Sequence, residues 1–166
     1  LKPLDVPGVG APPSAWRHPD AVLFDNGPLV THPGGGAGGA DASALQADVS
    51  RSSEVSTMVA EAVLRLRRID ILVNNVGIGG GDGPAHKVEE AAFDRILSVN
   101  LKGTWLVTKA VLAAMRTQKS GAIVNISSLA ARAGGIQVAY EISKAGVNRL
   151  TADVAKNGGE AVAKAT

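Results

Sequence analysis

The sequence predicts an α/β fold, a doubly wound parallel sheet with flanking helices, and two observations predict it. Two apolar runs of strand length, 69–73 and 121–126, show no alternation of polar and apolar residues, which is typical of parallel strands covered on both faces. Longer segments with helical periodicity separate these runs. Strands that alternate with helices along a chain favour a parallel sheet over other arrangements.

The chain of 166 residues has the length of one ordinary domain with a buried core. With 45% hydrophobic and 19% charged residues it has a globular composition. Residues 1–42 contain seven of the eight prolines and a glycine cluster, so we expect an irregular Pro/Gly-rich segment there. Residues 43–166 are then expected to form the folded core.

Several classes of function are disfavoured by composition. The chain has no cysteine, and His18, His32 and His86 lie far apart without ligand spacing, so we expect no metal site. The net charge of +2 and the 3% of aromatic residues argue against nucleic acid as a partner. No apolar run is long enough to span a membrane, and the first 20 residues lack an apolar signal core. A cytoplasmic protein is the resulting expectation.

The first elements of the core follow from residue 44 onward. Ala44–Val49 is compatible with a short strand. Ser52 or Ser53 is expected to cap a helix that runs to about Arg68, because serine is a favoured N-cap residue. The apolar face predicted for this helix consists of Val55, Met58, Val59, Ala62, Val63 and Leu66.

The middle of the chain predicts a strand, a loop and a long helical region. The run Ile69–Val73 is a strand that ends in Asn74-Asn75-Val76-Gly77, and a glycine loop follows over 77–83. Helical periodicity then extends from about residue 88 to about 118, with a break expected around Asn100. The apolar stripe of its second half consists of Leu101, Trp105, Leu106, Ala110, Val111 and Ala114.

The last predicted elements are a strand and a helix. The strand over 121–126 runs into a pair of serines, Ser127 and Ser128, and a helix is expected from Gln137 to about Ala155. Since parallel strands end at one edge of a sheet, residues 74–77 should meet the serine pair there. Open α/β sheets bind their ligands at that edge.

Tyr140, the only tyrosine of the chain, lies four residues before Lys144 on the last predicted helix. A phenol is a poor acid, with an ordinary pKa of about 10. Residues four apart on a helix share a face, and an ammonium about 5 Å away would favour the ionised phenol by roughly 3 kcal/mol at an effective dielectric near 20. A phenol so placed exchanges a proton with an alcohol or carbonyl oxygen. The alternative is a half-buried tyrosine with a solvated hydroxyl, for which this spacing is coincidental.

Five segments occur in an order and spacing that match a known family. They are Ala47-Asp48-Val49, the run from Ile69 to Gly77, Val99-Asn100-Leu101-Lys102-Gly103, the run from Gly121 to Ser128, and Tyr140 with Lys144. Through these motifs residues 42–155 resemble the short-chain dehydrogenase/reductase family. The resemblance covers about two thirds of the chain and implies a Rossmann-like dehydrogenase core over 43–166, incomplete at both ends.

The resemblance implies catalytic roles for four residues. Tyr140 would be the general acid or base, and Lys144 would make the phenol more acidic and bind the ribose of the nicotinamide half. Ser128 would hold the substrate oxygen, although the family's common spacing of thirteen residues to the tyrosine selects Ser127 instead. Asn100 would bind a water molecule that relays protons to solvent.

The resemblance also implies a cofactor, NAD or NADP, and a small-molecule alcohol or carbonyl substrate. Asp48 would contact the adenine amino group and Val49 the adenine face. Asn75 and Gly77 would let the backbone approach the cofactor ribose. The choice between NAD and NADP, and the identity of the substrate, stay open.

Each of these residues has a simpler structural interpretation. Asp48 ends a strand or starts a turn, and Asn100 is a helix N-cap. Asn74, at a strand end, satisfies backbone groups. Ser127 and Ser128 are turn residues. The glycine loop over 77–83 is flexible and has no phosphate role.

Two departures from the family pattern bear on activity. Thr31–Gly38 matches the family's phosphate-binding motif at Thr31, Gly36 and Gly38, but His32 replaces the first glycine. Only nine residues separate Gly38 from Asp48, where the family has a helix, a strand and a helix. We therefore expect this match to be coincidental or a relic. The chain also stops soon after the tyrosine helix, where the family continues with two more strands and a substrate-covering segment.

Three functional hypotheses follow. The first is an NAD(P)-dependent oxidoreductase that interconverts a secondary alcohol and a ketone by hydride transfer. The second is a truncated, inactive family member that acts as a dimerisation or binding partner. The third is a nucleotide-binding regulator without turnover. Because family members pair through the matching helices, the resemblance implies a homo-oligomer formed by helices at about 103–118 and 139–155.

Overall fold

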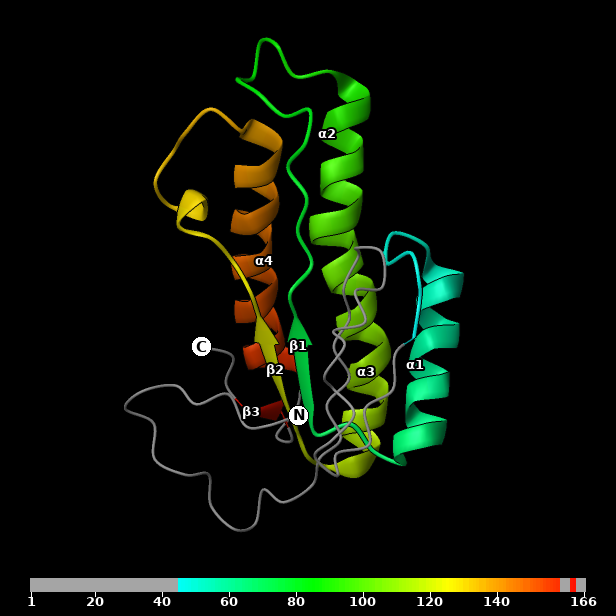
Figure 1. Ribbon diagram of the computed structural model, residues 1–166. Helices are drawn as coiled ribbons and strands as arrows, with labels where there is room; N and C mark the ends of the chain where they lie inside the picture. The colour runs from blue at the N-terminus through cyan, green and yellow to red at the C-terminus, as the bar shows by residue number, and fades with distance from the viewer. Residues whose placement is uncertain (1–44, 159–161, 164–166) are drawn as a thin grey trace, which may run out of the picture.

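The computed structural model of the protein describes residues 45–158 and 162–163 (Figure 1). Within them a parallel sheet has the strand order β1-β2-β3. Strand β1 pairs with β2 in a register that runs from Ile71 opposite Ala122 to Asn74 opposite Asn125. The prediction of a parallel sheet is therefore confirmed. Its strands are β1 (Ile71–Asn74), β2 (Gly121–Asn125) and β3 (Val162–Ala163).

The helices agree with the predicted order. Helices α2, η2 and α3 follow one another as a continuous column, and α4 runs beside it (Figure 1). The expected segment over 1–42, with the glycine match at 31–38, lies outside the described residues. The helical elements are α1 (Ser52–Leu66), α2 (Glu90–Leu97), the π-helix η2 (Ser98–Gly103), α3 (Thr104–Gln118), the 3₁₀-helix η3 (Leu129–Ala131) and α4 (Val138–Asn157).

The core lies between α1, α3 and the two longer strands. Each buried aliphatic side chain stabilises the fold by about 1.5–3 kcal/mol relative to exposure. Four of the six apolar positions predicted for α1 are buried, and the other two are half-buried. None of the helices in the described residues combines the length and hydropathy that crossing a bilayer requires. The central buried side chains include Val55, Met58, Leu72, Val107, Val111, Met115 and Ile123.

The predicted strand at Ala44–Val49 is wrong over its described part, 45–49, which contains no strand. The chain turns there instead, with the N–H of Arg51 donating to the carbonyl of Asp48 (3.0 Å). The carboxylate of Asp48 accepts from the N–H of Ser50 (2.9 Å) and from its hydroxyl (2.7 Å). A side chain that bonds the backbone two residues on favours a turn over a strand.

The predicted serine cap of α1 is also wrong. The N-cap is Arg51, which makes no side-chain capping hydrogen bond, so Ser52 is already helical. The preceding turn fixes this start, because Glu54 accepts a hydrogen bond from the N–H of Asp48 (2.8 Å). The helix ends at Leu66, two residues earlier than expected, where Arg67 takes a left-handed conformation with φ 68°.

The expected break around Asn100 is confirmed as the π-helix η2. Single π-helical turns inside longer helices occur often at functional sites. At the end of η2, a side chain on Gly103 would place its Cβ 2.7 Å from a methyl group of Val49. One residue of the predicted stripe differs, because Trp105 is 44% exposed while the neighbouring Leu106 is buried.

Candidate active site

The site begins at the edge of the sheet where β1 and β2 both end. Because the strands are parallel, the residues that follow Asn74 and Asn125 leave the sheet side by side. The N–H of Ile126 donates to the carbonyl of Asn74 (2.9 Å), which extends the pairing by one residue. Helix α4 runs alongside and brings Tyr140 and Lys144 to these strand ends (Figure 1).

Lys144 joins the two strand ends through its ammonium group. Its Nζ donates to the carbonyl of Val76 (3.0 Å) and to that of Ile126 (2.9 Å). The side chain is 3% exposed, and this burial lowers the pKa of Lys144 from its usual 10.5. An ammonium has three donors, so two are used here and the third is free for a further acceptor.

Tyr140 lies on the same side of α4 as Lys144. The Nζ of Lys144 is 5.9 Å from the centre of the phenol ring, within the range of a cation–π contact. The tyrosine is half-buried, whereas the lysine is buried. The predicted juxtaposition of these two groups is therefore present in the structure.

The two serines make different contacts. The hydroxyl of Ser127 donates to the backbone carbonyl of Lys144 (3.2 Å). The hydroxyl of Ser128 accepts from the N–H of Ala130 (3.2 Å) and caps η3. A hydroxyl has one proton to donate. The proton of Ser127 is thus engaged, while that of Ser128 is available for a substrate oxygen.

Asn100 fixes the coil that follows β1. Its side-chain oxygen accepts from the N–H of Ile78 (2.8 Å), and its Nδ2 donates to the Ile78 carbonyl (2.9 Å) and to the hydroxyl of Ser143 (3.0 Å). Ser143 in turn donates to the carbonyl of Tyr140 (2.7 Å). Asn100 lies inside η2 and is fully buried, so the N-cap interpretation is wrong.

Three further predicted residues lie at the end of β1. Asn74 is buried, and its Nδ2 donates to side chains of Thr108 (3.0 Å) and Asn125 (2.7 Å) rather than to the backbone as expected. Asn75 is exposed. A Cβ on Gly77 would lie 3.3 Å from the Nζ of Lys144, which shows how closely the backbone approaches the ammonium there.

Asp48 and Val49 stand apart from this group. Hydrogen bonds from the hydroxyl and N–H of Ser50, and then the charge of Arg51, hold the pKa of Asp48 below its usual value. The side chain of Val49 is buried at 2% exposure and packs beside Gly103. Their predicted contacts with adenine stay predictions.

Sequence reasoning missed Asp82 and Ser143. The carboxylate of Asp82 binds the N-terminus of α4 through the N–H groups of Ala139 (3.2 Å) and Tyr140 (2.7 Å). No local signal pairs a helix with a cap 58 residues earlier in the chain. Ser143, directly before the lysine, could have been found from its place on the same helix.

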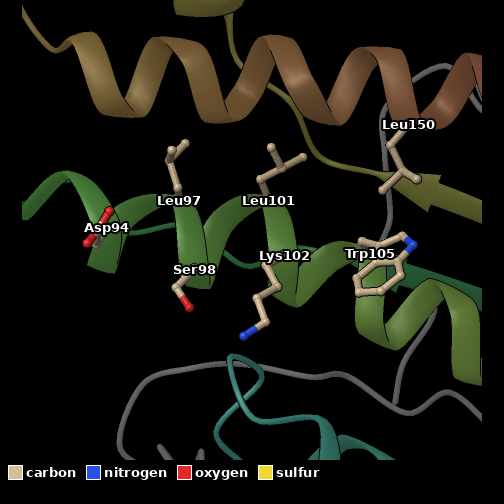
Figure 2. Close-up of a pocket in the computed structure, with 7 residues that line it drawn as sticks. All are labelled: Asp94, Leu97, Ser98, Leu101, Lys102, Trp105 and Leu150. Carbon is tan, nitrogen blue, oxygen red and sulfur yellow. The ribbon is translucent and has the colours of Figure 1, made fainter.

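A cavity of about 560 Å³ lies on another part of the molecule, between the α2–η2–α3 column and α4 (Figure 2). Figure 2 shows Leu97 and Leu101 pointing from the column toward α4, and Leu150 of α4 pointing toward Trp105. Its lining is largely apolar, and it does not include Tyr140 or Lys144.

The comparisons with known proteins decide the family. The model of the short chain dehydrogenase family matches residues 30–162. This chain belongs to that family. The predicted resemblance and the Rossmann-like fold are therefore confirmed.

The similar proteins include reductases and dehydrogenases. The chain is 40% identical over 121 residues to a 3-oxoacyl-[acyl-carrier-protein] reductase of Synechocystis sp., covering 72% of this chain and 49% of that protein. It is 40% identical over 109 residues to an uncharacterized oxidoreductase of Mycobacterium bovis, covering 64% of this chain and 44% of the relative. The chain thus spans about half the length of the curated relatives it matches.

Solved structures give the same result for the fold. Levodione reductase superposes with a TM-score of 0.73 and 37% identity over 76% of this chain and 50% of the other. NAD⁺-bound xylitol dehydrogenase superposes with a TM-score of 0.72 and 32% identity, over 75% of this chain and 48% of the other.

Proposed function

We propose that this chain forms the core of an NAD(P)-dependent oxidoreductase that interconverts a secondary alcohol and a ketone. The observation that carries the proposal is the pair of Tyr140 and Lys144, placed on one side of α4 where two strands end. The similarity to a 3-oxoacyl-[acyl-carrier-protein] reductase and to levodione reductase supports the same class of reaction.

The residues at the strand ends fit a nicotinamide dinucleotide. The third donor of the Lys144 ammonium is suited to a ribose hydroxyl. Gly77 leaves the backbone open beside that ammonium, since a Cβ there would lie within 3.3 Å of it. When bound, the nicotinamide would supply or accept the hydride.

The chain's own residues donate a proton to the substrate oxygen or accept one from it. In the direction of reduction, the phenol of Tyr140 donates its proton to the carbonyl oxygen, and in the direction of oxidation the phenolate takes it back. The positive charge of Lys144 stabilises the phenolate, and its hydrogen bonds to Val76 and Ile126 hold that charge in place. Ser128 donates its free hydroxyl proton to the substrate oxygen.

Asn100 is the fourth residue of the proposed machinery. We assign it the positioning of a water molecule for proton relay from Lys144 to solvent. Both N–H groups of its side-chain amide donate, to Ile78 and Ser143, and its side-chain oxygen accepts from Ile78, so we assign the water to its backbone carbonyl. That carbonyl accepts from the hydroxyl of Thr104 (2.7 Å) and has a second lone pair.

A binding and turnover experiment tests the proposal. NADH and NADPH are titrated while nicotinamide fluorescence is followed, and turnover is then measured with a panel of ketones. Binding with turnover that is lost in Tyr140→Phe is expected. Binding without turnover would favour the nucleotide-binding regulator. Neither binding nor turnover would favour the truncated, inactive family member that acts as a binding partner.

We also propose that the chain forms a homo-oligomer through α3 and α4. Trp105 is 44% exposed on α3, and the 560 Å³ cavity beside it opens between α3 and Leu150 of α4. A second cavity of about 330 Å³ continues along the same two helices. A second copy of the chain would cover this apolar face.

A further inference from the structure

The first turn of α4 is capped by a loop that lies far away in sequence. The N–H of Val138 donates to the carbonyl of Gly83 (3.1 Å). The N–H groups of Ala139 and Tyr140 donate to the two carboxylate oxygens of Asp82, at 3.2 and 2.7 Å. These first N–H groups of a helix have no acceptor within the helix itself. Residues 82–83 therefore satisfy all three.

The helix does not supply this cap from its own sequence. Its N-cap residue, Gln137, makes no side-chain capping hydrogen bond. Instead, the N–H of Gln137 donates to the carboxylate of Glu141 (3.1 Å). The position at which α4 begins is thus set by Asp82, whose own Oδ1 also accepts from the N–H of Gly83 (2.8 Å).

Asp82 ends a coil that is held along its length. This coil rises from the end of β1 (Figure 1) and contacts α2, η2 and α4. Asp82 is therefore not a free cap, because the coil before it is anchored to side chains of three helical elements. The anchoring contacts are Lys144 with the carbonyl of Val76, Asn100 with Ile78, and Arg95 with the carbonyl of Gly80.

We infer that Asp82 is a positioning residue for Tyr140. The ammonium of Lys144 is pinned to two strand ends at one end of the pair, and the backbone of Tyr140 is pinned by Asp82 at the other. Groups outside α4 therefore hold both residues of the pair at the strand ends. The inference rests on the proposed role of Tyr140 as proton donor, since without that role this placement would have no catalytic meaning.

The single tyrosine of the chain provides a direct readout. Chain labelled with 3-fluorotyrosine gives one ¹⁹F resonance, which reports the surroundings of the Tyr140 ring. Asp82→Ala should shift or split this resonance, because both carboxylate contacts are lost. Asp82→Asn should cause a smaller shift, because the amide keeps one acceptor oxygen.

Asp70→Ala is the matched control. It removes the same charge from the residue that directly precedes β1, at the end of that strand opposite the site, where Asp70 accepts from the side chain of Arg68 (2.9 Å). The control should keep the parent resonance. An equal shift in Asp70→Ala would overturn the inference, because any loss of a carboxylate would then have the same effect.

A parent-like resonance in both Asp82 variants would also overturn the inference that Asp82 positions Tyr140, even if their melting temperatures change. If Asp82→Ala fails to fold, the resonance of Asp82→Asn alone decides: a shift supports the inference, and a parent-like resonance overturns it. In the active enzyme, Asp82→Asn should lower kcat while the cofactor KM stays at the parent value. The two proposals fail separately. Absence of NAD(P)H binding would refute the proposed function. The ¹⁹F resonance does not depend on turnover, so it would still show whether Asp82 positions Tyr140.

Discussion

At the scale of single residues, the buried ammonium of Lys144 affects both the proposed reaction and the stability of the fold. A buried ammonium is costly unless hydrogen bonds replace its water. Two backbone carbonyls do so here, and both belong to residues just beyond strand ends. The same burial that lowers the pKa of this lysine also makes the stability of the fold depend on pH.

We predict a pH-dependent difference in stability between the parent chain and Lys144→Met. Between the lowered pKa of folded Lys144 and its usual 10.5, the unfolded chain binds more protons than the folded chain, so the free energy of unfolding rises with pH. Below that window the cost of the buried charge is constant. Methionine abolishes this dependence.

Urea denaturation at a series of pH values measures the prediction. The parent should gain stability relative to Lys144→Met as pH rises toward about 10.5, and the difference should then level off. Other titrating groups cancel between the two chains. A difference that is the same at every pH would contradict the lowered pKa.

The two serines provide a second prediction at this scale. Ser128→Ala should reduce kcat by about 100-fold or more, in the range seen when one donor to a reacting oxygen is removed. Ser127→Ala should reduce it by less than about tenfold, because its hydroxyl donates to the Lys144 carbonyl instead. Steady-state kinetics on the two single variants compares them. The reverse order of effects would assign the role to Ser127.

At the scale of elements, η2 determines how the long helical column packs against the turn before α1 and against the site. The π-helical segment buries Asn100 and Gly103 together. Asn100 then reaches the coil after β1, and Gly103 allows the close approach of Val49. The column would not contact both neighbours if either residue were replaced by a larger apolar one.

Gly103→Ala tests this close approach. The added Cβ would lie 2.7 Å from a methyl of Val49, whose branched side chain has little freedom to move. Overpacking costs about 1–3 kcal/mol, and the higher helix propensity of alanine offsets up to about 1 kcal/mol of it. We expect a net loss of about 1–2 kcal/mol in chemical denaturation.

Gly134→Ala is the control for that measurement, because no atom lies within 4 Å of the added Cβ. It should change stability by no more than about 0.5 kcal/mol. Equal stabilities of the two variants would mean that the contact between Val49 and η2 relaxes without cost.

At the scale of the whole molecule, the exposed apolar face of α3 and α4 is the surface through which we propose that the chain assembles. We predict that Trp105→Glu converts the proposed homo-oligomer to monomer, because a charge would be buried at the centre of the interface. Light scattering coupled to size-exclusion chromatography measures the mass. Leu64→Glu is the control, since Leu64 is 78% exposed on α1, away from this face. A parent chain that elutes as a monomer would contradict the homo-oligomer.

Much of the fold and part of the site follow from local sequence. Strands β1 and β2 were predictable from continuous apolar runs of strand length. Burial on both faces, which such runs predict, is not seen within the described residues, because Ile71 is 47% exposed and only Ile123 of β2 is buried. The helices were predictable from periodicity, except at the start of α1, where the Asp48 turn moved the cap to Arg51. The pairing of Tyr140 with Lys144 followed from i,i+4 spacing alone.

The sequence by itself determined the order of elements and the placing of the phenol and the amine on one helix, because both depend on interactions within a few residues. The tertiary structure alone decided which serine keeps a free proton, which groups bind the side chain of Asn100, and which residue caps the start of α4. Those contacts join residues 17 to 58 positions apart. They exist only after the elements have packed, and no local pattern encodes their geometry.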